Sequence, residues 1–125
     1  MDKKKLLIVE DEPVLNKALQ EFMSADGFEV VTAIDGEEGI RKAQSELPDL
    51  ILLDIILPKK DGYEVIKEIK AGEKTKNIPV ILLTNLGSVN DVEKAVELGA
   101  TTYLVKADYK MEEVAKKIKD ILGME

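Results

Sequence analysis

Short apolar runs recur along the chain, and each run is followed at once by a polar residue. The runs at residues 6–9, 50–53, 80–83 and 103–105 are followed by Glu10 and Asp11, Asp54, Thr84 and Lys106, respectively. Strands that are apolar at nearly every position are typical of a parallel sheet covered on both faces. Because ligands of such sheets bind beyond the carboxyl ends of the strands, we expect three acids, a hydroxyl and an ammonium group at one edge.

Segments with helical periodicity lie between these runs, so the pattern of a strand followed by a helix repeats five times. We expect strands at about residues 5–9, 29–33, 50–54, 80–84 and 102–105. We expect helices from Pro13 to about Asp26, after Gly36, after Gly62, from about Ser88 to Leu98 with Gly99 as its stop, and around Val114 to Leu122. Right-handed crossovers then favour a doubly wound α/β sheet, and residues 1–125 fit a single domain.

Composition excludes several functional classes. The chain contains no cysteine and no histidine, which excludes a disulfide scaffold, a thiolate zinc site and a histidine-dependent serine hydrolase. Its formal net charge of -7 has the wrong sign for attraction to phosphate backbones, so we expect no direct nucleic-acid binding. The apolar run near the amino terminus is too short for a signal peptide or a membrane span, so we expect a cytoplasmic protein with no membrane association.

Glu10, Asp11 and Asp54 are the candidate metal ligands. An acidic pair before a helix also suits the positive end of the helix dipole, and for Glu10 and Asp11 alone that interpretation is equally good. Asp54 favours the metal, because three converging carboxylates repel one another unless a cation lies between them. The acids come from separate strand ends and not from one flexible loop, so magnesium is expected rather than calcium.

Thr84 and Lys106 complete the candidate site. Considered alone, Thr84 is explained by the preference of β-branched residues for strands, and Lys106 is explained as a solvated surface lysine. Because both are expected next to the acids, a role in the site is the better explanation for each. A carboxylate, a divalent cation, a hydroxyl and an ammonium group together suit phosphoryl transfer onto Asp54. No separate base is needed, because an ionised aspartate is already a nucleophile.

These residues resemble the receiver domains of bacterial two-component response regulators, over essentially the whole chain. Glu10 and Asp11 match the acidic pair that binds magnesium, and Asp54 matches the phosphoacceptor in an Asp-x-x-x-Pro-x-x-x-Gly setting through Pro58 and Gly62. Thr84 and Lys106 are similar to the switch hydroxyl and the active-site lysine. Five such matches in order, at these separations, are highly specific.

The resemblance implies a flavodoxin-like sheet of order 2-1-3-4-5, with the backbone carbonyl of Ile56 as a further magnesium ligand. It also implies that a histidine kinase or histidine phosphotransfer protein donates the phosphoryl group. The expected switch draws Thr84 towards the phosphoryl group, rotates Tyr103, and changes the surface of the fourth helix, fifth strand and fifth helix for an effector protein or domain. A monomer or a weak phosphorylation-dependent dimer is expected.

The chain departs from the family pattern at three places. Ala107 follows Lys106 where proline is usual, Asn85 follows Thr84 where a small residue is common, and Thr101-Thr102 replaces an acidic pair that often precedes the aromatic residue. Ile56 and Leu86 are both apolar, and the resemblance implies that their positions border the path of the hydrolytic water. We therefore expect slow self-dephosphorylation and no enzymatic activity beyond the chain's own phosphorylation chemistry.

Three alternatives belong to other functional classes. A degenerate receiver that binds partners without phosphorylation ranks second, although the full set of site residues argues against it. An aspartyl phosphohydrolase needs a second acid where Ile56 stands, and a flavodoxin-like electron carrier needs a phosphate-binding loop after the first strand. The sequence does not identify the cognate kinase or the output, and it fits either a stand-alone receiver or the amino-terminal part of a longer regulator.

Overall fold

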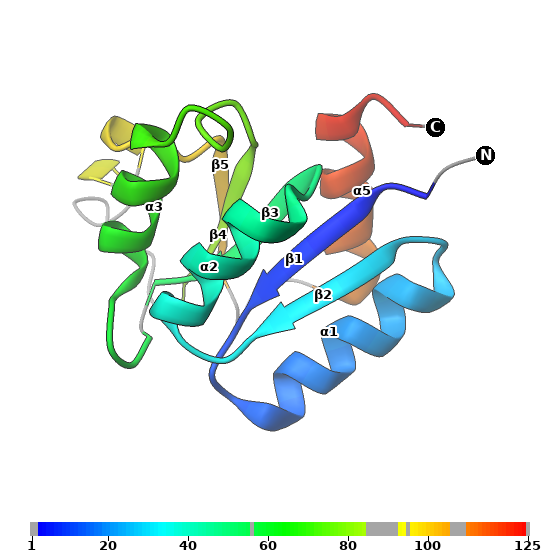
Figure 1. Cartoon of the computed structure of the whole chain (residues 1–125). Coiled ribbons are helices and arrows are strands. Elements are labelled where there is room, and N and C mark those ends of the chain that lie inside the picture. The colour runs from blue at the N-terminus through cyan, green and yellow to red at the C-terminus, as the bar shows by residue number, and fades with distance from the viewer. Residues whose placement is uncertain (1–2, 56, 85–92, 95, 106–109, 125) are drawn as a thin grey trace.

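Five parallel strands form one sheet in the order β2-β1-β3-β4-β5, which confirms the expected order (Figure 1). The computed structural model describes residues 3–55, 57–84, 93–94, 96–105 and 110–124. The strands are β1 (Lys5–Val9), β2 (Glu29–Ala33), β3 (Leu50–Asp54), β4 (Val80–Thr84) and β5 (Thr102–Val105). Their bounds are those expected from the sequence, because each apolar run is the part of its segment that the sheet buries.

Helices follow the strands as the periodicity predicts. They are α1 (Pro13–Ala25), α2 (Gly36–Glu46), α3 (Gly62–Ala71) and α5 (Met111–Leu122). The fourth expected helix is only partly described: residues 93–94 and 96–97 are helical, and Gly99 follows with a φ of 114° that ends the turn. Among the described residues, no helix has both the length and the apolar character needed to cross a membrane.

Alternate residues of the central strands pack on opposite faces of the sheet. One face carries Leu7, Val9, Ile51 and Leu53, which join a core with residues of α2 and α3. The other face carries Leu6, Ile8, Leu50 and Leu52, which join a second core with residues of α1 and α5. All eight of these side chains have no exposed surface, so β1 and β3 form the rigid centre of the molecule.

All strands run in one direction, and their carboxyl ends lie at one edge of the sheet. At the opposite edge of the sheet β1 begins and α5 finishes (Figure 1). The edge made by the carboxyl ends therefore lies away from the start of β1 and the end of α5.

Candidate metal and phosphoacceptor site

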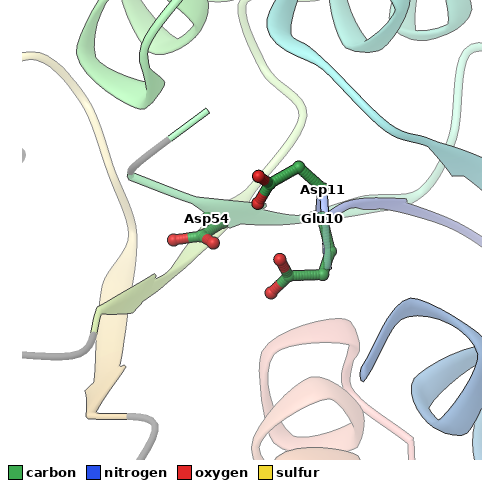
Figure 2. A group of neighbouring side chains, drawn as sticks. All are labelled: Glu10, Asp11 and Asp54. Atoms are coloured by element: carbon green, nitrogen blue, oxygen red, sulfur yellow. The ribbon is translucent and has the colours of Figure 1, made fainter. Parts of the chain in front are cut away.

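Three carboxylates meet where β1 and β3 end. These strands are neighbours, with Val9 paired to Leu53, so the residues that follow Val9 lie beside Asp54 at the end of β3. One carboxylate oxygen from each of Glu10, Asp11 and Asp54 lies within 4.8 Å of the other two (Figure 2). The structure thus brings together all three acids predicted from the sequence.

The donor set of this group fits a hard divalent cation. It consists of carboxylate oxygens only, which suit magnesium or calcium rather than a softer metal. Glu10 has no exposed surface and Asp54 is 5% exposed, whereas Asp11 is exposed. Two acids are therefore fixed in the protein and one faces solvent, an arrangement that suits a magnesium ion retaining several of its waters.

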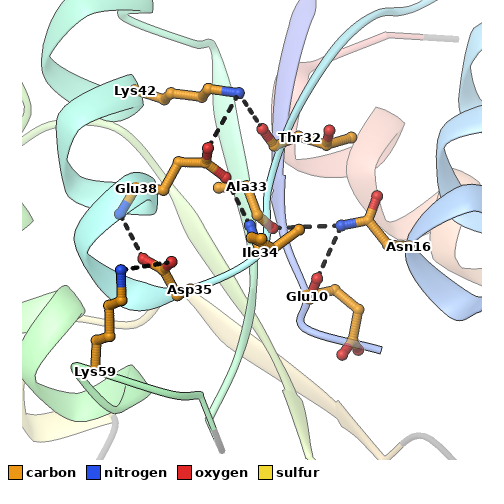
Figure 3. A network of polar contacts seen from close by, with 9 residues as sticks. All are labelled: Glu10, Asn16, Thr32, Ala33, Ile34, Asp35, Glu38, Lys42 and Lys59. Atoms are coloured by element: carbon orange, nitrogen blue, oxygen red, sulfur yellow. Dashed lines mark hydrogen bonds and ion pairs between the residues drawn. The ribbon is translucent and has the colours of Figure 1, made fainter. Parts of the chain in front are cut away.

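Glu10 is held in place by its own backbone and by α1. Its amide donates a 3.0 Å hydrogen bond to the carbonyl oxygen of Ala33, and its Oε2 accepts a 3.0 Å hydrogen bond from the amide of Glu12. Asn16 is a buried residue of α1, and its side chain contacts the backbone of Glu10 and Ala33 (Figure 3). We did not predict Asn16 from the sequence, although a carboxamide on the face that buries Leu19 and Met23 was a readable signal.

The loop after Asp54 is fixed by close backbone contacts. The amide of Gly62 donates a 2.7 Å hydrogen bond to the carbonyl oxygen of Ile55, and a β-carbon on Gly62 would lie 2.8 Å from the carbonyl oxygen of Asp54. Gly36 at the start of α2 lies against the backbone of Lys60, and its amide donates to the carbonyl of Pro58 at 3.3 Å. Both glycines are required because another side chain would push the loop away from Asp54 or α2.

Asp35 ties this loop to the start of α2. Its Oδ1 accepts a 2.8 Å hydrogen bond from the amide of Glu38, so it caps the helix, and the carboxylate of Glu38 reaches back to the amide of Ile34. The hydrogen bond from Glu38 and the ammonium of Lys59, 3.7 Å away, hold the pKa of Asp35 below its usual value (Figure 3). Lys59 itself has a φ of 68°, in the left-handed region.

The remaining predicted site residues are only partly described. Thr84 ends β4 and is paired with Val105, which places its backbone at the same edge as Asp54. Ile56 and Lys106 lie outside the described residues, so the structure does not test their roles. Tyr103 lies on β5 and its side chain is 41% exposed.

The departures from the family pattern are described only in part as well. Asn85, Leu86 and Ala107 lie outside the described residues. The hydroxyl of Thr101, where the family often has an acid, accepts a 3.3 Å hydrogen bond from the amide of Val80. Its side chain is thus used locally to join the start of β5 to β4.

Comparison with known families decides the relationship. The family model of the response regulator receiver domain matches residues 6–119 of this sequence. The chain belongs to the response regulator receiver family. It is thus a phosphoacceptor type of domain from two-component signalling, and the predicted fold class and family are confirmed.

Solved receiver domains superpose closely on this one. A chemotaxis response regulator of Vibrio cholerae is 29% identical with a TM-score of 0.90, covering 96% of this chain and 99% of that one. The receiver domain of a Pseudomonas aeruginosa sensor histidine kinase, which has a magnesium ion coordinated in its active-site cleft, is 31% identical with a TM-score of 0.89. That match covers 98% of this chain and 99% of the other.

Curated relatives of this chain include transcriptional regulators. A probable transcriptional regulator of Cyanophora paradoxa is 43% identical over 98% of this chain and 49% of its own length. A DNA-binding dual master transcriptional regulator of Synechocystis is 35% identical over 94% of this chain and 48% of its own length. This receiver domain spans about half the length of the curated relatives it matches. The expectation of no direct nucleic-acid binding therefore finds no support in its relatives.

Proposed function

We propose that this receiver domain is a magnesium-dependent switch in which Asp54 accepts a phosphoryl group from a histidine kinase or a histidine phosphotransfer protein. One observation carries the proposal: the carboxylate of Asp54 lies within 4.8 Å of the acid pair, at the edge of the sheet where ligands of this fold bind. Membership of the receiver family supports this type of reaction, and the acid group supports Asp54 as its proposed site.

In the proposed reaction, a carboxylate oxygen of Asp54 attacks the phosphorus of a phosphohistidine. The new phosphorus–oxygen bond replaces the phosphorus–nitrogen bond, and the electron pair of that bond stays on the imidazole nitrogen. A proton on the other ring nitrogen of the phosphohistidine makes the leaving imidazole neutral. The proposed ligands of magnesium are Glu10, Asp11, Asp54 and the carbonyl of Ile56. Magnesium bound there would neutralise charge on the transferring group. Lys106 adds a further positive charge, and the chain needs no general base because Asp54 reacts as the carboxylate.

The proposed switch follows from the charge that phosphorylation adds. A phosphoryl group brings about 1.5 to 2 negative charges and three acceptor oxygens to Asp54. The hydroxyl of Thr84 moves to this acceptor, and Tyr103 turns inward into the space that Thr84 leaves. The surface formed by the segment around residues 93–97, β5 and α5 then changes for its partner. Moving this equilibrium from 1:99 to 99:1 requires roughly 5.5 kcal/mol of differential stabilisation.

The proposal also covers the surroundings of the reaction. The domain acts in the cytoplasm, as a monomer or a weak phosphorylation-dependent dimer, and it catalyses nothing beyond its own phosphorylation and slow dephosphorylation. Since the relatives are transcriptional regulators about twice this length, the proposed partner is an effector domain or protein that controls transcription.

The test is the intact mass of the protein after incubation with acetyl phosphate and magnesium. We expect one added phosphoryl group, which is absent without magnesium and absent in Asp54→Ala. No addition to the wild type, together with no binding of fluoroberyllate, would instead favour a degenerate receiver that binds partners without phosphorylation. Asp54→Asn then separates the two in cells, because signalling that persists unchanged requires no phosphoacceptor.

A further inference from the structure

Asn16 joins three elements at one point behind the acid pair. Its side-chain amide donates a 2.8 Å hydrogen bond to the carbonyl oxygen of Glu10 and a 3.3 Å hydrogen bond to the carbonyl oxygen of Ala33 (Figure 3). The side chain belongs to α1, whereas Glu10 follows β1 and Ala33 ends β2. Asn16 is 8% exposed, so these hydrogen bonds lie in a region with little competition from water.

The backbone of Glu10 is therefore fixed from both sides. Its amide donates to Ala33 and its carbonyl accepts from Asn16, which leaves its peptide units little freedom to rotate. Its carboxylate accepts from the amide of Glu12, at the start of the helix that carries Asn16. A shift of α1 relative to β1 would thus move the backbone and the carboxylate of Glu10 together.

We propose that Asn16 is a positioning residue for the magnesium ligands Glu10 and Asp11. In this role Asn16 acts through the backbone and is not itself a ligand. It fixes the backbone from which the two acids project, so that their oxygens lie near Asp54 before a cation binds. Residues that orient metal ligands without touching the metal typically change the affinity about 10- to 100-fold when they are replaced.

The assignment rests on the magnesium-dependent function proposed above, and its test is magnesium affinity in Asn16→Leu. Leucine has the same number and branching of side-chain heavy atoms as asparagine, although its methyl groups are bulkier, and it removes the donor. Asn16→Ala is titrated alongside as a second variant. Its smaller side chain leaves room for water to hydrogen-bond the two carbonyl oxygens, so this variant tests the role if Asn16→Leu does not fold. The control is Met23→Ala, which removes packing from the same buried face of α1, about two helical turns from Asn16.

Two quantities are measured: the magnesium dissociation constant by calorimetric titration, and the exchange rate of the Glu12 amide by NMR in metal-free protein. We expect Asn16→Leu and Asn16→Ala to bind magnesium about 10-fold more weakly than the wild type does, with faster exchange of the Glu12 amide. Met23→Ala is expected to lower the urea midpoint while leaving both quantities near their wild-type values.

The outcomes separate the two proposals. The role of Asn16 is overturned if both variants at position 16 bind magnesium within about twofold of wild type and the exchange rate of the Glu12 amide is unchanged. That result leaves the proposed function intact. Equal weakening of magnesium binding in Met23→Ala also overturns it, because general loss of stability then explains the effect. A wild-type protein that binds no magnesium overturns the proposed function and this assignment with it.

Discussion

The amide of Gly62, the first residue of α3, donates a 2.7 Å hydrogen bond to the carbonyl oxygen of Ile55, which directly follows Asp54. The start of the helix therefore closes the loop that begins at the proposed phosphoacceptor. A β-carbon at position 62 would lie 2.6 Å from the Cα of Ile55, which is closer than real contacts of this kind. The position of Asp54 thus depends on the absence of a side chain eight residues later.

Gly62→Ala should destabilise the protein and displace the loop that follows Asp54. Overpacking of this kind costs about 1 to 3 kcal/mol, measured as the free energy of unfolding in urea. Gly27→Ala is the matched control: Gly27 has a φ of 99° and no neighbouring atom within 4 Å of its β-carbon position, so it tests backbone strain without steric conflict. Only Gly62→Ala should slow phosphorylation by acetyl phosphate; equal slowing in both variants contradicts the local explanation.

Asp11→Asn should raise the melting temperature of the metal-free protein and abolish the rise that magnesium produces. Three carboxylates within 4.8 Å of one another repel, and neutralising the exposed one relieves part of that repulsion. In the wild type, magnesium at about 100 times its dissociation constant should stabilise the fold by about 2.7 kcal/mol. Glu12→Gln, outside the group, should keep the magnesium effect. A metal-free Asp11→Asn that melts earlier than wild type contradicts the prediction.

Asp35→Ala should lower the free energy of unfolding by about 1 kcal/mol at neutral pH, because it removes the cap of α2. The pKa of Asp35 lies below its usual value of 3.8, mainly through the hydrogen bond from the Glu38 amide. The stabilisation is therefore present above pH 4 or so and is lost as the pH falls through the lowered pKa. Urea titrations across this range measure the difference. Asp35→Asn, which keeps an acceptor without a charge, should show a smaller cost at neutral pH but the same change with pH, because only the wild-type carboxyl titrates at this position.

Ile56→Asn should shorten the lifetime of the phosphorylated protein. An apolar side chain cannot orient a water molecule for attack on the phosphoryl group, whereas a carboxamide can. We expect the phosphoryl group to be lost about tenfold faster than in the wild type. This effect is smaller than the rate increase of roughly 100-fold or more that a well-placed general base supplies. The lifetime is followed by intact mass after removal of the phosphodonor, with Ile56→Val as the control. A wild-type lifetime of only seconds contradicts the proposed slow dephosphorylation.

Tyr103 should become less accessible when the site binds magnesium and fluoroberyllate. Its side chain is 41% exposed, and the proposed switch turns it inward. In a variant with Tyr63→Phe and Tyr109→Phe, Tyr103 is the remaining source of tyrosine fluorescence, and its quenching by acrylamide should decrease. The phenyl ring at position 63 keeps the aromatic face on which the ammonium of Lys94 lies 4.4 Å from the ring centroid. Unchanged quenching would contradict an inward rotation of Tyr103.

The sequence predicted the sheet well because each strand is defined by its own residues. A run such as Leu50-Ile51-Leu52-Leu53 is typical of a strand buried on both faces in the middle of a parallel sheet, and the polar residues on either side of it mark its bounds. The acid group followed from the same argument, since Glu10, Asp11 and Asp54 each come directly after a strand. The roles of Thr84 and Lys106 stay predictions.

The contacts that orient the acids were not predictable in the same way. Asn16 acts through the carbonyls of Glu10 and Ala33, and Asp35 acts through Lys59 on a different loop. No local pattern links such partners, because they meet only when α1, α2 and the loop after β3 pack on the sheet. The fold class could therefore be read from periodicity, whereas the fine positioning of the site required the structure.

The separation of the chain ends from the acid group has a practical consequence. The start of β1 and the end of α5 lie at the edge of the sheet opposite the carboxyl ends of β1 and β3, where Glu10 and Asp54 are found (Figure 1). A surface linker, an affinity tag or a fluorophore attached at either end leaves the acidic edge facing the solution, open to a protein as large as a kinase. Binding assays on immobilised protein should therefore give the same affinity whichever end is tethered.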